Sequence, residues 1–540
     1  MKKYFHACQF LIMLLVVLSS GVLAQVTRQP YLQIVTPVSI VVRWDTSTPE
    51  AGTVSYGLSL TALTENLSEA AATIKHQVSV SGLSPNTKYY YSIGGPSAGD
   101  SGHYFITAPE SGSEANTRIW VISDWGQTDD GDNARRTQSV NVWKTFNNND
   151  YHASFIISCG DQTESDTEPE LSSTFFGGLV DVLKNTPLYT ISGNHDDHDG
   201  RVVYKSVFSI PDQAEAGGYP SGSKDYYSFN FGNIHVVALS CEGVAIDGAQ
   251  KAWLQNDLAN NHSDWLIAFH HRPMHSAGYH PSDGSSTSLS EKVNWLTLLE
   301  DAGVDLVLSG HNHVYERSYL VDNLTGNSTD ITAANRLDTL LGRLDGDGAY
   351  KKPLGCVPHK GTIFITCEAG GVSNSSSHYP VPYGFIPVHF AGSDFEGSLV
   401  IDVSGPNQMD VKFLCTDDNP FMPKDHIWDH FTLIKEGVTV VGGSSRQLPD
   451  GISVSNFPNP FNPSTTIIYH LPQNGYVSIR LYDLLGRQIS VLYDGWQEQG
   501  NHVIQWTAQD DQGRELPGGI YLAQIQSGGS LRSTKMMLIR

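Results

Sequence analysis

The sequence predicts a multidomain protein in which two β-sandwiches flank a central α/β domain. Its 540 residues correspond to three or four domains at about 150 residues each. Hydrophobic residues make up 39% of the chain, enough for packed cores, while 51 glycines and 26 prolines indicate many strands and turns. The hydrophobic pattern changes near residues 110 and 440, and these two changes mark the expected domain boundaries.

Residues 1–24 have the pattern of a secretory signal peptide. Two lysines precede the apolar run Phe10–Leu18, and small or apolar residues at positions 22 and 24 precede Gln25. The apolar run is shorter than the roughly 20 residues that a membrane-spanning helix needs. We therefore expect an exported mature chain without a transmembrane segment.

Residues 26–110 are predicted to form the N-terminal β-sandwich. Ser39–Trp44 and His76–Val80 alternate apolar and polar residues, as strands with one buried face do. Turn residues at 83–87 lead into three consecutive tyrosines at 89–91. Short strands at this spacing are typical of a sandwich of roughly 85–100 residues.

Residues 117–435 are predicted to form the central α/β domain. Short, fully apolar runs alternate there with helical patterns such as Ala249–Asn260 and Ser290–Asp301. That alternation predicts a buried sheet flanked by helices. Asp322–Pro358 is rich in Gly, Asp and Asn and is predicted to be a loop-like insertion.

Residues 436–452 are a predicted linker, and residues 453–540 are predicted to form the C-terminal β-sandwich. Tyr476–Leu481, Val503–Trp506 and Ile520–Ile525 have strand patterns, and glycines occupy the turns near them. Composition alone predicts no more than a small β-sandwich in this region.

Five apolar runs of the central domain each lead into residue types that bind metals. If these runs are neighbouring strands, their carboxyl ends bring the polar side chains to one sheet edge, where α/β folds place their sites. Each residue alone could be a turn or surface residue, but five coincidences favour a common site. The residues are Asp124, Asp161, Asn194, the pair His270-His271, and His311 with His313.

These segments resemble the ordered sequence blocks of the calcineurin-like metallophosphoesterases, and most of all those of the purple acid phosphatases. Gln29–Gln33 is similar to the start of that branch's fibronectin type III-like domain, so the resemblance spans roughly residues 26–435. It implies a four-layer α/β/β/α arrangement for the central domain. The blocks are Asp124-Trp-Gly-Gln-Thr, Gly160-Asp161, Gly193-Asn194-His195-Asp196, His271-Arg272-Pro273-Met274 and Gly310-His311-Asn312-His313.

The resemblance implies two metal ions that share one carboxylate. Ions about 3.5–4 Å apart clamp the attacking and leaving oxygens of a phosphate ester and lower the pKa of bound water toward 7. A mixed oxygen and imidazole set suits divalent or trivalent iron, zinc or manganese. The implied ligands are Asp161 as the bridge, Asp124 and His313 on the first ion, and Asn194, His271 and His311 on the second.

The same resemblance implies catalytic roles for His195 and His280, which would contact a phosphate oxygen or the leaving group. For His280, a solvated loop position is an equally good interpretation. His270 would point away from its neighbour His271 because successive strand residues face opposite sides. Where the purple enzymes carry an iron-binding tyrosine, this chain has Glu164. We expect Glu164 or water to complete the first metal site, and hence a colourless enzyme.

The C-terminal region resembles the type A sorting domain of the bacterial type IX secretion system. The resemblance lies in Asn456–Thr465, Tyr482–Arg487 and Gly518–Tyr521, and Ser533–Arg540 completes it. It implies export to the periplasm by the signal peptide and then translocation across the outer membrane by the type IX machinery. The protein is therefore expected to be secreted or displayed at the cell surface.

These features predict a secreted two-metal phosphoesterase that acts on a small phosphate ester through in-line attack by metal-bound hydroxide. The first interpretation is a phosphomonoesterase of the acid phosphatase type. A phosphodiesterase or nucleotidase is the alternative, because the metal core does not dictate the leaving group. A non-catalytic surface-binding protein with a degenerate site is the alternative from another class. The net charge of −23 argues against a nucleic-acid scaffold role.

Overall fold

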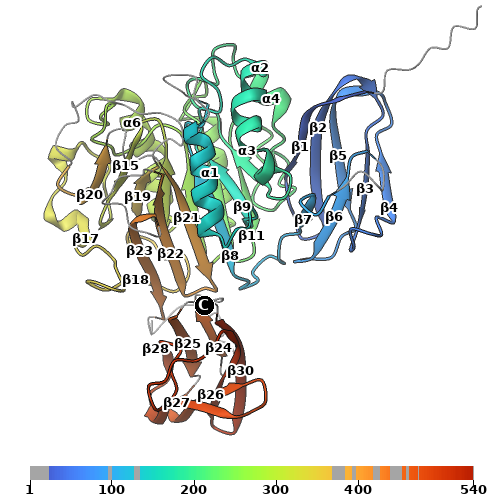
Figure 1. Ribbon diagram of the computed structural model, residues 1–540. Helices are drawn as coiled ribbons and strands as arrows, with labels where there is room; N and C mark the ends of the chain where they lie inside the picture. Colours follow the sequence, from blue (N-terminus) through green and yellow to red (C-terminus); the bar gives the residue numbers. More distant parts are fainter. Residues whose placement is uncertain are drawn as a thin grey trace, which may run out of the picture.

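The computed structural model separates the chain into three units (Figure 1). The N-terminal module (residues 26–110, blue) lies beside the central domain, and the C-terminal module (residues 453–538, red) lies below it in this view. The predicted signal peptide, except Ala24, and most of the predicted linker lie outside the described residues. The described residues are 24–94, 100–126, 134–367, 383–391, 397–416, 426–437, 453–457, 461, 463–471 and 473–538.

The N-terminal module consists of a three-stranded sheet, β1-β2-β5, and a four-stranded sheet, β4-β3-β6-β7. The strands predicted from alternating residues and from the three tyrosines are β2, β5 and β6. Their inward residues, such as Val78 and Val80 of β5, are buried. The strands are β1 (Val26–Gln33), β2 (Ser39–Glu50), β3 (Thr53–Gly57), β4 (Glu65–Ser68), β5 (Thr73–Ser81), β6 (Lys88–Ser92) and β7 (Tyr104–Ile106).

The first sheet of the central domain has seven strands in the order β10-β9-β8-β21-β22-β23-β18. Its strands β8, β9 and β10 are parallel neighbours, so their carboxyl ends meet at one edge. The strands are β8 (Thr117–Ile122), β9 (Phe155–Ser158), β10 (Leu188–Thr190), β18 (Tyr350–Pro353), β21 (Gly397–Ser404), β22 (Gln408–Cys415) and β23 (Ile427–Glu436).

The second sheet also has seven strands, in the order β11-β12-β13-β14-β19-β15-β20. Strands β12, β13, β14 and β19 run parallel. The strands are β11 (Tyr227–Phe231), β12 (Ile234–Ala238), β13 (Trp265–Phe269), β14 (Leu306–Ser309), β15 (Val314–Arg317), β19 (Ile363–Thr366) and β20 (Val388–Ala391).

The two central sheets pack face to face, and helices cover their outer faces. Within β8, Ile119 and Val121 join the core between the sheets, whereas Trp120 joins the core beneath the helices. This alternation explains why these strands are apolar throughout, since both of their faces are buried. Helices α1 (Ala134–Phe146), α2 (Glu168–Leu171), α3 (Gly177–Leu183) and α4 (Val202–Val207) cover the first sheet, and α5 (Ala249–Ala259), α6 (Ser286–Glu291) and α7 (Thr297–Asp301) the second.

The helices predicted at Ala249–Asn260 and Ser290–Asp301 correspond to α5 and to the segment α6–α7. The second begins earlier than predicted, at Ser286, because the hydroxyl of Ser285 accepts a 3.2 Å hydrogen bond from the Ser288 amide and caps the helix. A π-helical turn, Lys292–Leu296, lies between α6 and α7. A serine-rich first turn hides this start from a search for apolar periodicity.

The predicted loop-like insertion, Asp322–Pro358, is only partly a loop, and the prediction is wrong for its second half. Strand β18 lies within it and pairs in parallel with β23, which makes it the edge strand of the first sheet. Its first half contains two short 3₁₀ turns and β17 (Arg336–Asp338), which pairs with β16 (Leu320–Val321). Because β18 reads Tyr350-Lys-Lys-Pro353, it lacks the apolar run by which buried strands are found.

The C-terminal module has a three-stranded sheet, β24-β25-β28, and a four-stranded sheet, β27-β26-β29-β30. The three strands predicted from sequence are β26, β28 and β29. No helix among the described residues is long and apolar enough to cross a membrane. The strands are β24 (Ser453–Phe457), β25 (Thr465–Leu471), β26 (Gly475–Asp483), β27 (Gln488–Gln497), β28 (Gly500–Trp506), β29 (Gly519–Ser527) and β30 (Ser530–Leu538).

Candidate metal centre

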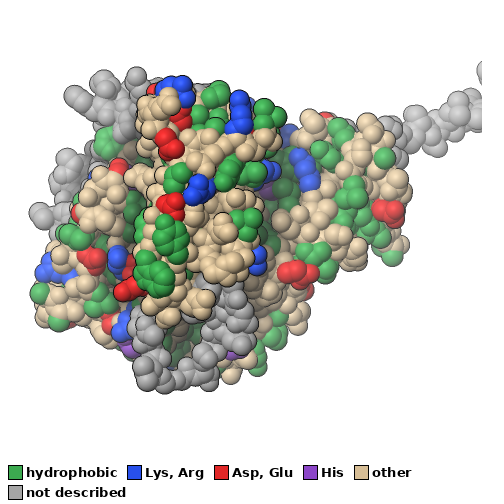
Figure 2. Space-filling view, turned by 90° about the horizontal axis from the view of Figure 1, so that it is seen from below, with side chains coloured by type: hydrophobic (Ala, Val, Ile, Leu, Met, Phe, Trp, Pro, Cys, Tyr) green, Lys and Arg blue, Asp and Glu red, His purple; other side chains and the backbone are tan. Residues whose placement is uncertain are grey.

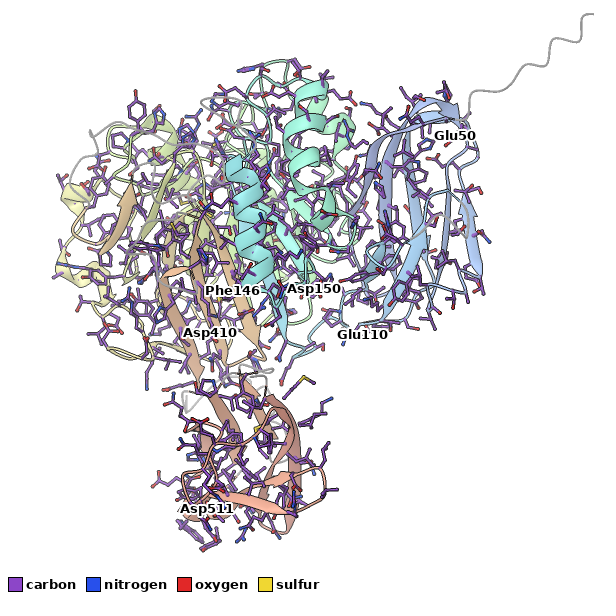
Figure 3. All side chains as sticks on the ribbon, in the orientation of Figure 1. Glu50, Glu110, Phe146, Asp150, Asp410 and Asp511 are labelled. Atoms are coloured by element: carbon purple, nitrogen blue, oxygen red, sulfur yellow. The ribbon has the colours of Figure 1, made fainter. Side chains whose placement is uncertain are left out.

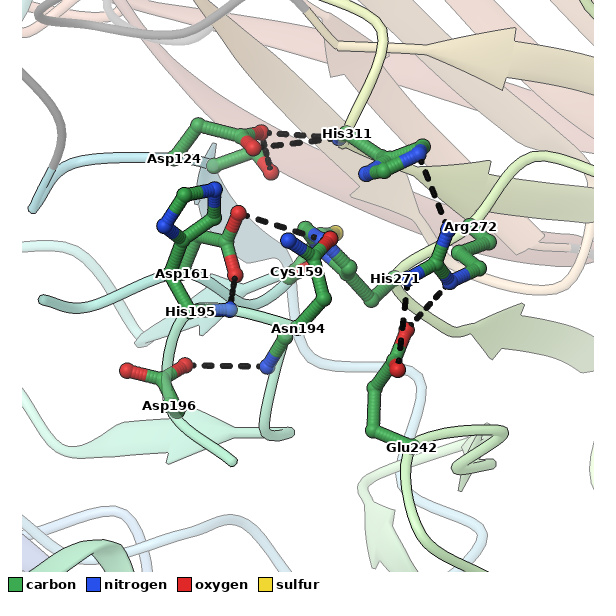
Figure 4. Close-up of polar contacts among 12 residues, drawn as sticks. Asp124, Cys159, Asp161, Asn194, His195, Asp196, Glu242, His271, Arg272 and His311 are labelled. Carbon is green, nitrogen blue, oxygen red and sulfur yellow. Dashed lines mark hydrogen bonds and ion pairs between the residues drawn. The ribbon is translucent and has the colours of Figure 1, made fainter. Parts of the chain in front are cut away.

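The predicted site residues follow strands of both central sheets. The expectation of a single sheet edge is therefore wrong, because the side chains meet between the carboxyl ends of two facing sheets (Figure 4). An apolar run in a sequence does not tell which sheet its strand joins. Strands β8, β9 and β10 lead into Asp124, Asp161 and Asn194, and strands β13 and β14 lead into His271, His311 and His313.

Four of these residues have left-handed backbone conformations. The φ angles are 50° for Asp124, 52° for Asp161, 69° for His311 and 39° for His313. Residues with a Cβ avoid this region, and each such conformation costs on the order of 1–3 kcal/mol. Conformations of this kind persist where the surrounding structure imposes them, and they cluster at functional sites. The turns after β8, β9 and β14 thus share left-handed backbone conformations, which ordinary strand ends rarely contain.

Two glycines of the sequence blocks leave room for the ligand-type side chains. A Cβ at Gly160 would overlap the ring of His271, and a Cβ at Gly193 would overlap the carboxylate of Asp161. Gly160 also has a φ of 106°, a region that favours glycine. The glycines in Gly160-Asp161 and Gly193-Asn194 therefore allow two sheets to bring their polar side chains into contact.

His271 lies at the middle of the group and is fully buried. Its Nδ1 lies 2.9 Å from the carbonyl oxygen of Cys159, which can only accept a hydrogen bond, so this nitrogen carries a proton. Its Nε2 lies 3.0 Å from Oδ1 of Asn194 and 3.3 Å from Oδ2 of Asp161. Burial lowers the pKa of His271, but the charge of Asp161 outweighs it and raises the pKa to about 10. In the metal-free protein, the positive charge of the His271 ring thus lies beside the oxygen atoms of Asn194 and Asp161.

Asp161 joins the residues of the two sheets. One ligand atom each from Asp161, His271 and His311 lies within 4.8 Å of the others. The amide of His195 donates a 2.9 Å hydrogen bond to Oδ1 of Asp161 and holds the carboxylate in place. The carboxylate is buried, and Asn194 adds an amide oxygen through its contact with His271. The three closest ligand types are therefore a carboxylate, an imidazole pair and an amide.

Asp124 and His313 form the second part of the group. Nε2 of His313 lies 3.5 Å from Oδ1 of Asp124, and the amide of His311 donates to both carboxylate oxygens at 3.2 and 3.0 Å. Burial raises the pKa of Asp124, but the His313 hydrogen bond and the charge of His271 hold it well below its usual range. Asp124 is therefore a carboxylate in the folded protein, as a metal ligand must be.

His195, Glu164 and His280 lie at the rim of the group. Nδ1 of His195 lies 3.0 Å from the carbonyl oxygen of Glu164 and 3.6 Å from its carboxylate. The carboxylate of Glu164 is half exposed, and the described cluster of ligand atoms does not include it. The ring of His280 stacks on the ring of His311 with centroids 4.6 Å apart, although much of His280 is exposed.

His270 lies on the opposite side of β13 from His271. Its ring is fully buried beside Trp295, and its Nδ1 lies 3.9 Å from Oε1 of Glu291 on α6. Burial lowers the pKa of His270 to about 3 and raises the pKa of Glu291 to about 8, so both groups are neutral at pH 7. His270 therefore belongs to the core beneath the helices.

Two charged residues beside the cluster were not found by the sequence analysis. Nη1 of Arg272 lies 3.2 Å from Nε2 of His311, and Glu242 holds the guanidinium through a 2.6 Å contact (Figure 4). Arg272 follows His271 directly, so its position in the block was a signal. Glu242 follows β12 in a loop without any such pattern, and only the fold brings it here.

The donor set fits metal ions. Oxygen and imidazole donors without thiolates suit zinc, iron or manganese. The Nδ1 proton of His271 is held by a carbonyl oxygen, which is the contact that metal-binding histidines make with their other nitrogen, so Nε2 is the atom on which an ion would replace the second proton. Asp161 lies between the two parts of the group, so one carboxylate can serve both.

Comparison with known protein families identifies all three units. Residues 27–108 match the purple acid phosphatase N-terminal domain, residues 117–315 match the calcineurin-like phosphoesterase family, and residues 455–540 match the secretion system C-terminal sorting domain. The first match agrees with the expected branch, while the fibronectin type III-like character of this module stays a prediction.

Curated relatives include several plant proteins. Purple acid phosphatase 15 of Arabidopsis thaliana is 32% identical over 280 residues, which cover 46% of this chain and 50% of the relative. Probable purple acid phosphatase 20 of the same plant is 28% identical, over 54% of this chain and 68% of the relative. An uncharacterized protein of Mycobacterium tuberculosis is 25% identical over 42% of this chain and 43% of the relative. The chain spans about half the length of most of these relatives.

Solved structures share the fold. Purple acid phosphatase PPD1 from yellow lupin (Lupinus luteus) seeds superposes with a TM-score of 0.56 at 16% identity, over 75% of this chain and 74% of the lupin chain. The structure of PhoD superposes with a TM-score of 0.52 at 11% identity, over 76% and 89%. Residues 27–108 thus match a purple acid phosphatase N-terminal domain, residues 117–315 a calcineurin-like phosphoesterase domain and residues 455–540 a secretion system C-terminal sorting domain, and the solved structures share the fold.

Proposed function

We propose that the protein hydrolyses phosphate monoesters outside the cell with two metal ions held between the central sheets. The observation that carries this proposal is the convergence of Asp161, His271 and His311 from three strand ends of two sheets, with ligand atoms within 4.8 Å of one another. The sorting domain supports a secreted or cell-surface location. The broader assignment, that the protein is a phosphoesterase, rests on the match of residues 117–315 to the calcineurin-like phosphoesterase family.

Each ion would be held by residues of both sheets. Asp161 would be shared, Asp124 and His313 would complete the first site, and Asn194, His271 and His311 would complete the second. When bound, the ion pair supplies positive charge that neutralises phosphate oxygens and lowers the pKa of water. Five of these six side chains already contact another member of the group within 3.5 Å, so the ions would bind with little rearrangement.

The remaining residues of the site would bind and orient the substrate. His195 is 29% exposed beside Glu164, and we assign it contact with a phosphate oxygen or protonation of the leaving group. Glu164 lies where it can hold the His195 ring, so we assign it this positioning role in place of the metal bond considered from sequence. Arg272, which Glu242 fixes beside His311, places a guanidinium where a phosphate dianion would lie.

A panel of phosphate monoesters and diesters tests the proposal on the metal-loaded full chain. Asp161→Ala should lower kcat/KM for monoesters at least about a thousandfold, or on the order of 4 kcal/mol of barrier, because both ions lose their shared ligand. The matched control is Asp181→Ala. It removes an exposed carboxylate of α3 that pairs with Lys184, and it should leave activity unchanged. Equal activity of the Asp161 variant would refute the proposal, and turnover of diesters alone would favour the phosphodiesterase alternative.

A further inference from the structure

A second group of ligand-type side chains lies where the insertion 322–358 leaves and rejoins the second sheet. Glu300 lies near the end of α7, Asp322 directly follows β16, and His359 precedes β19. One ligand atom from each of these residues lies within 4.8 Å of the other two. The neck of the insertion is closed here, because Val321 and Thr362 exchange backbone hydrogen bonds of 3.0 and 2.7 Å.

Two carboxylates of this group are removed from water. Glu300 is 2% exposed and Asp322 is 6% exposed. Adjacent buried carboxylates disfavour each other's ionised form, and a cation placed between them removes that penalty.

The orientation of His359 points to a metal ion between these carboxylates. Its Nε2 lies 3.0 Å from Oδ1 of Asp301, and its Nδ1 lies 3.1 Å from Oδ1 of Asp322. Metal-binding histidines nearly always donate their second N–H to a carboxylate or carbonyl oxygen. With the Nε2 proton held by Asp301, a cation that replaces the proton between Nδ1 and Asp322 would meet the Nδ1 lone pair and the carboxylates of Asp322 and Glu300.

A simple ion pair accounts for less of this arrangement. A protonated His359 would satisfy Asp301 and Asp322, but Glu300 would keep only backbone donors, such as the Asn323 amide at 2.9 Å. The buried carboxylate of Glu300, which completes the group, would then take no part in the ion pair. One imidazole nitrogen and two carboxylates are instead the ligand types of zinc and related divalent ions.

We propose that Glu300, Asp322 and His359 bind one divalent transition-metal ion of the zinc class, which ties both ends of the insertion to α7. The site is separate from the candidate metal centre. Glu300 precedes β14, whereas His311 follows it, so the two sites lie at opposite ends of this strand. The proposal does not rest on the phosphoesterase function, because its ligands and its structural effect are independent of catalysis.

Metal content and thermal unfolding of the full chain test this site. Protein freed of metals and then loaded with Zn²⁺ should hold one ion more per chain than His359→Gln, and its Tm should rise by about 5 °C more. Glu300→Gln, which keeps the size of the side chain, should behave in the same way. His430→Gln is the matched control, because His430 forms a 2.8 Å pair with Asp345 and belongs to no three-ligand group among the described residues.

Limited proteolysis provides a local readout. Zn²⁺ should slow tryptic cleavage after Arg336 and Arg343 in the insertion at least tenfold in the wild type and the His430 variant, and should not do so in the two site variants. Phosphate monoester hydrolysis should stay within twofold in all of them. Equal zinc content and equal protection in the wild type and His359→Gln would overturn the proposal, as would protection by Ca²⁺ but not by Zn²⁺.

Discussion

The two β modules at the ends of this chain are built alike but are joined to the central domain in different ways. Each has a three-stranded and a four-stranded sheet. The core of the N-terminal module is continuous with the core between the central sheets, in which Leu32 and Trp44 belong to the same cluster as Ile157 and Phe229. Among the residues that the structure describes, the two clusters of the C-terminal module contain only residues of that module.

Polar contacts reinforce the N-terminal junction. The hydroxyl of Tyr31 donates to the carbonyl oxygen of Val207 at 2.8 Å, and the guanidinium of Arg43 donates to the carbonyl oxygen of Ser206 at 2.9 Å. Lower on the interface, the Tyr104 hydroxyl reaches the Asp150 carboxylate that Figure 3 labels beside the module. We infer that the N-terminal module and the central domain unfold together, whereas the C-terminal module is an independent unit.

The C-terminal module exposes several large apolar side chains. Leu484, Leu485 and Trp496 are 65%, 80% and 68% exposed. Seen from below, apolar, acidic and basic side chains are interspersed on the face of the molecule that carries this module (Figure 2). Exposed apolar side chains suit a module that other proteins recognise during export. They would be a liability in a module that only supported the enzyme.

Removal of either terminal module should distinguish the two junctions most clearly. A chain that lacks residues 453–540 should keep kcat/KM within twofold, because the site and its supporting cores lie elsewhere. A chain that lacks residues 25–110 should be insoluble or lose at least about 5 kcal/mol of stability, since it exposes apolar surface such as Phe176, on which the Tyr31 ring packs at 4.6 Å. Activity, solubility and calorimetric unfolding measure both effects.

A soluble, active chain without the N-terminal module would contradict the shared core. A chain without the C-terminal module that loses activity in proportion to its stability would show that this module also supports the enzyme. In the full chain, calorimetry should resolve two transitions, and only the one assigned to the C-terminal module should vanish on truncation.

One buried ion pair tests the N-terminal junction at a single residue. Arg28 lies 2.6 Å from Asp45 within its own module and 3.2 Å from Glu168 of α2, and its side chain is 2% exposed. Arg28→Met should lower the free energy of unfolding by about 3 kcal/mol, because it leaves the Asp45 carboxylate without its partner in a buried place. Denaturant unfolding of the metal-loaded chain measures this loss.

The matched control for Arg28 lies in the C-terminal module. Arg480 pairs with Asp494 at 3.1 Å, but both side chains are 38% exposed, so Arg480→Met should cost less than about 1 kcal/mol. Its effect should also be confined to the transition of that module. Similar losses of unfolding free energy in both variants would mean that the ion pairs of Arg28 contribute no more to stability than an exposed pair does.

The sequence predicted the elements whose signal is local. Apolar runs such as Trp265–Phe269 became strands β13 and its neighbours because a strand buried on both faces needs apolar residues throughout. Strand β18 was missed because its contribution to the sheet is one of backbone pairing at an edge, which Lys351 and Lys352 do not reveal. The shared core was also missed, since alternating residues in β2 look the same whether they face a sister sheet or another domain.

The site was predicted at the level of residue types but not of geometry. Asp161, His271 and His311 come from blocks that were recognised, and the structure brings their ligand atoms together. Their meeting between two sheets depends on long-range packing that no segment encodes alone. The same limit hid Glu242, and it hid the pairing of Asp322 with His359 across the neck of the insertion.

The stability of the unit formed by the N-terminal module and the central domain should depend on pH. Glu291 is fully buried on α6, and burial raises its pKa from 4.5 to about 8. The folded chain therefore binds this proton more tightly than the unfolded chain does. Its contribution to stability is complete below pH 4.5 and is lost as the pH rises toward 8. Glu291→Gln should remove this loss and exceed the wild type in stability by on the order of 2 kcal/mol at pH 6.

Because Glu291 lies in the central domain, this variant also reports which units unfold together. The difference in unfolding free energy between Glu291→Gln and the wild type should be near zero at pH 4.5 and grow with pH. The titration of His270 acts in the opposite direction, but it occurs in both proteins and therefore cancels in this difference. If the N-terminal module shares the central core, both should unfold in the transition that shifts, while the C-terminal transition stays fixed. A pH-independent difference would place the Glu291 carboxylate in a more hydrated setting than its burial indicates. If the unfolding of the N-terminal module did not change with that of the central domain, the two would unfold separately in spite of the core they share.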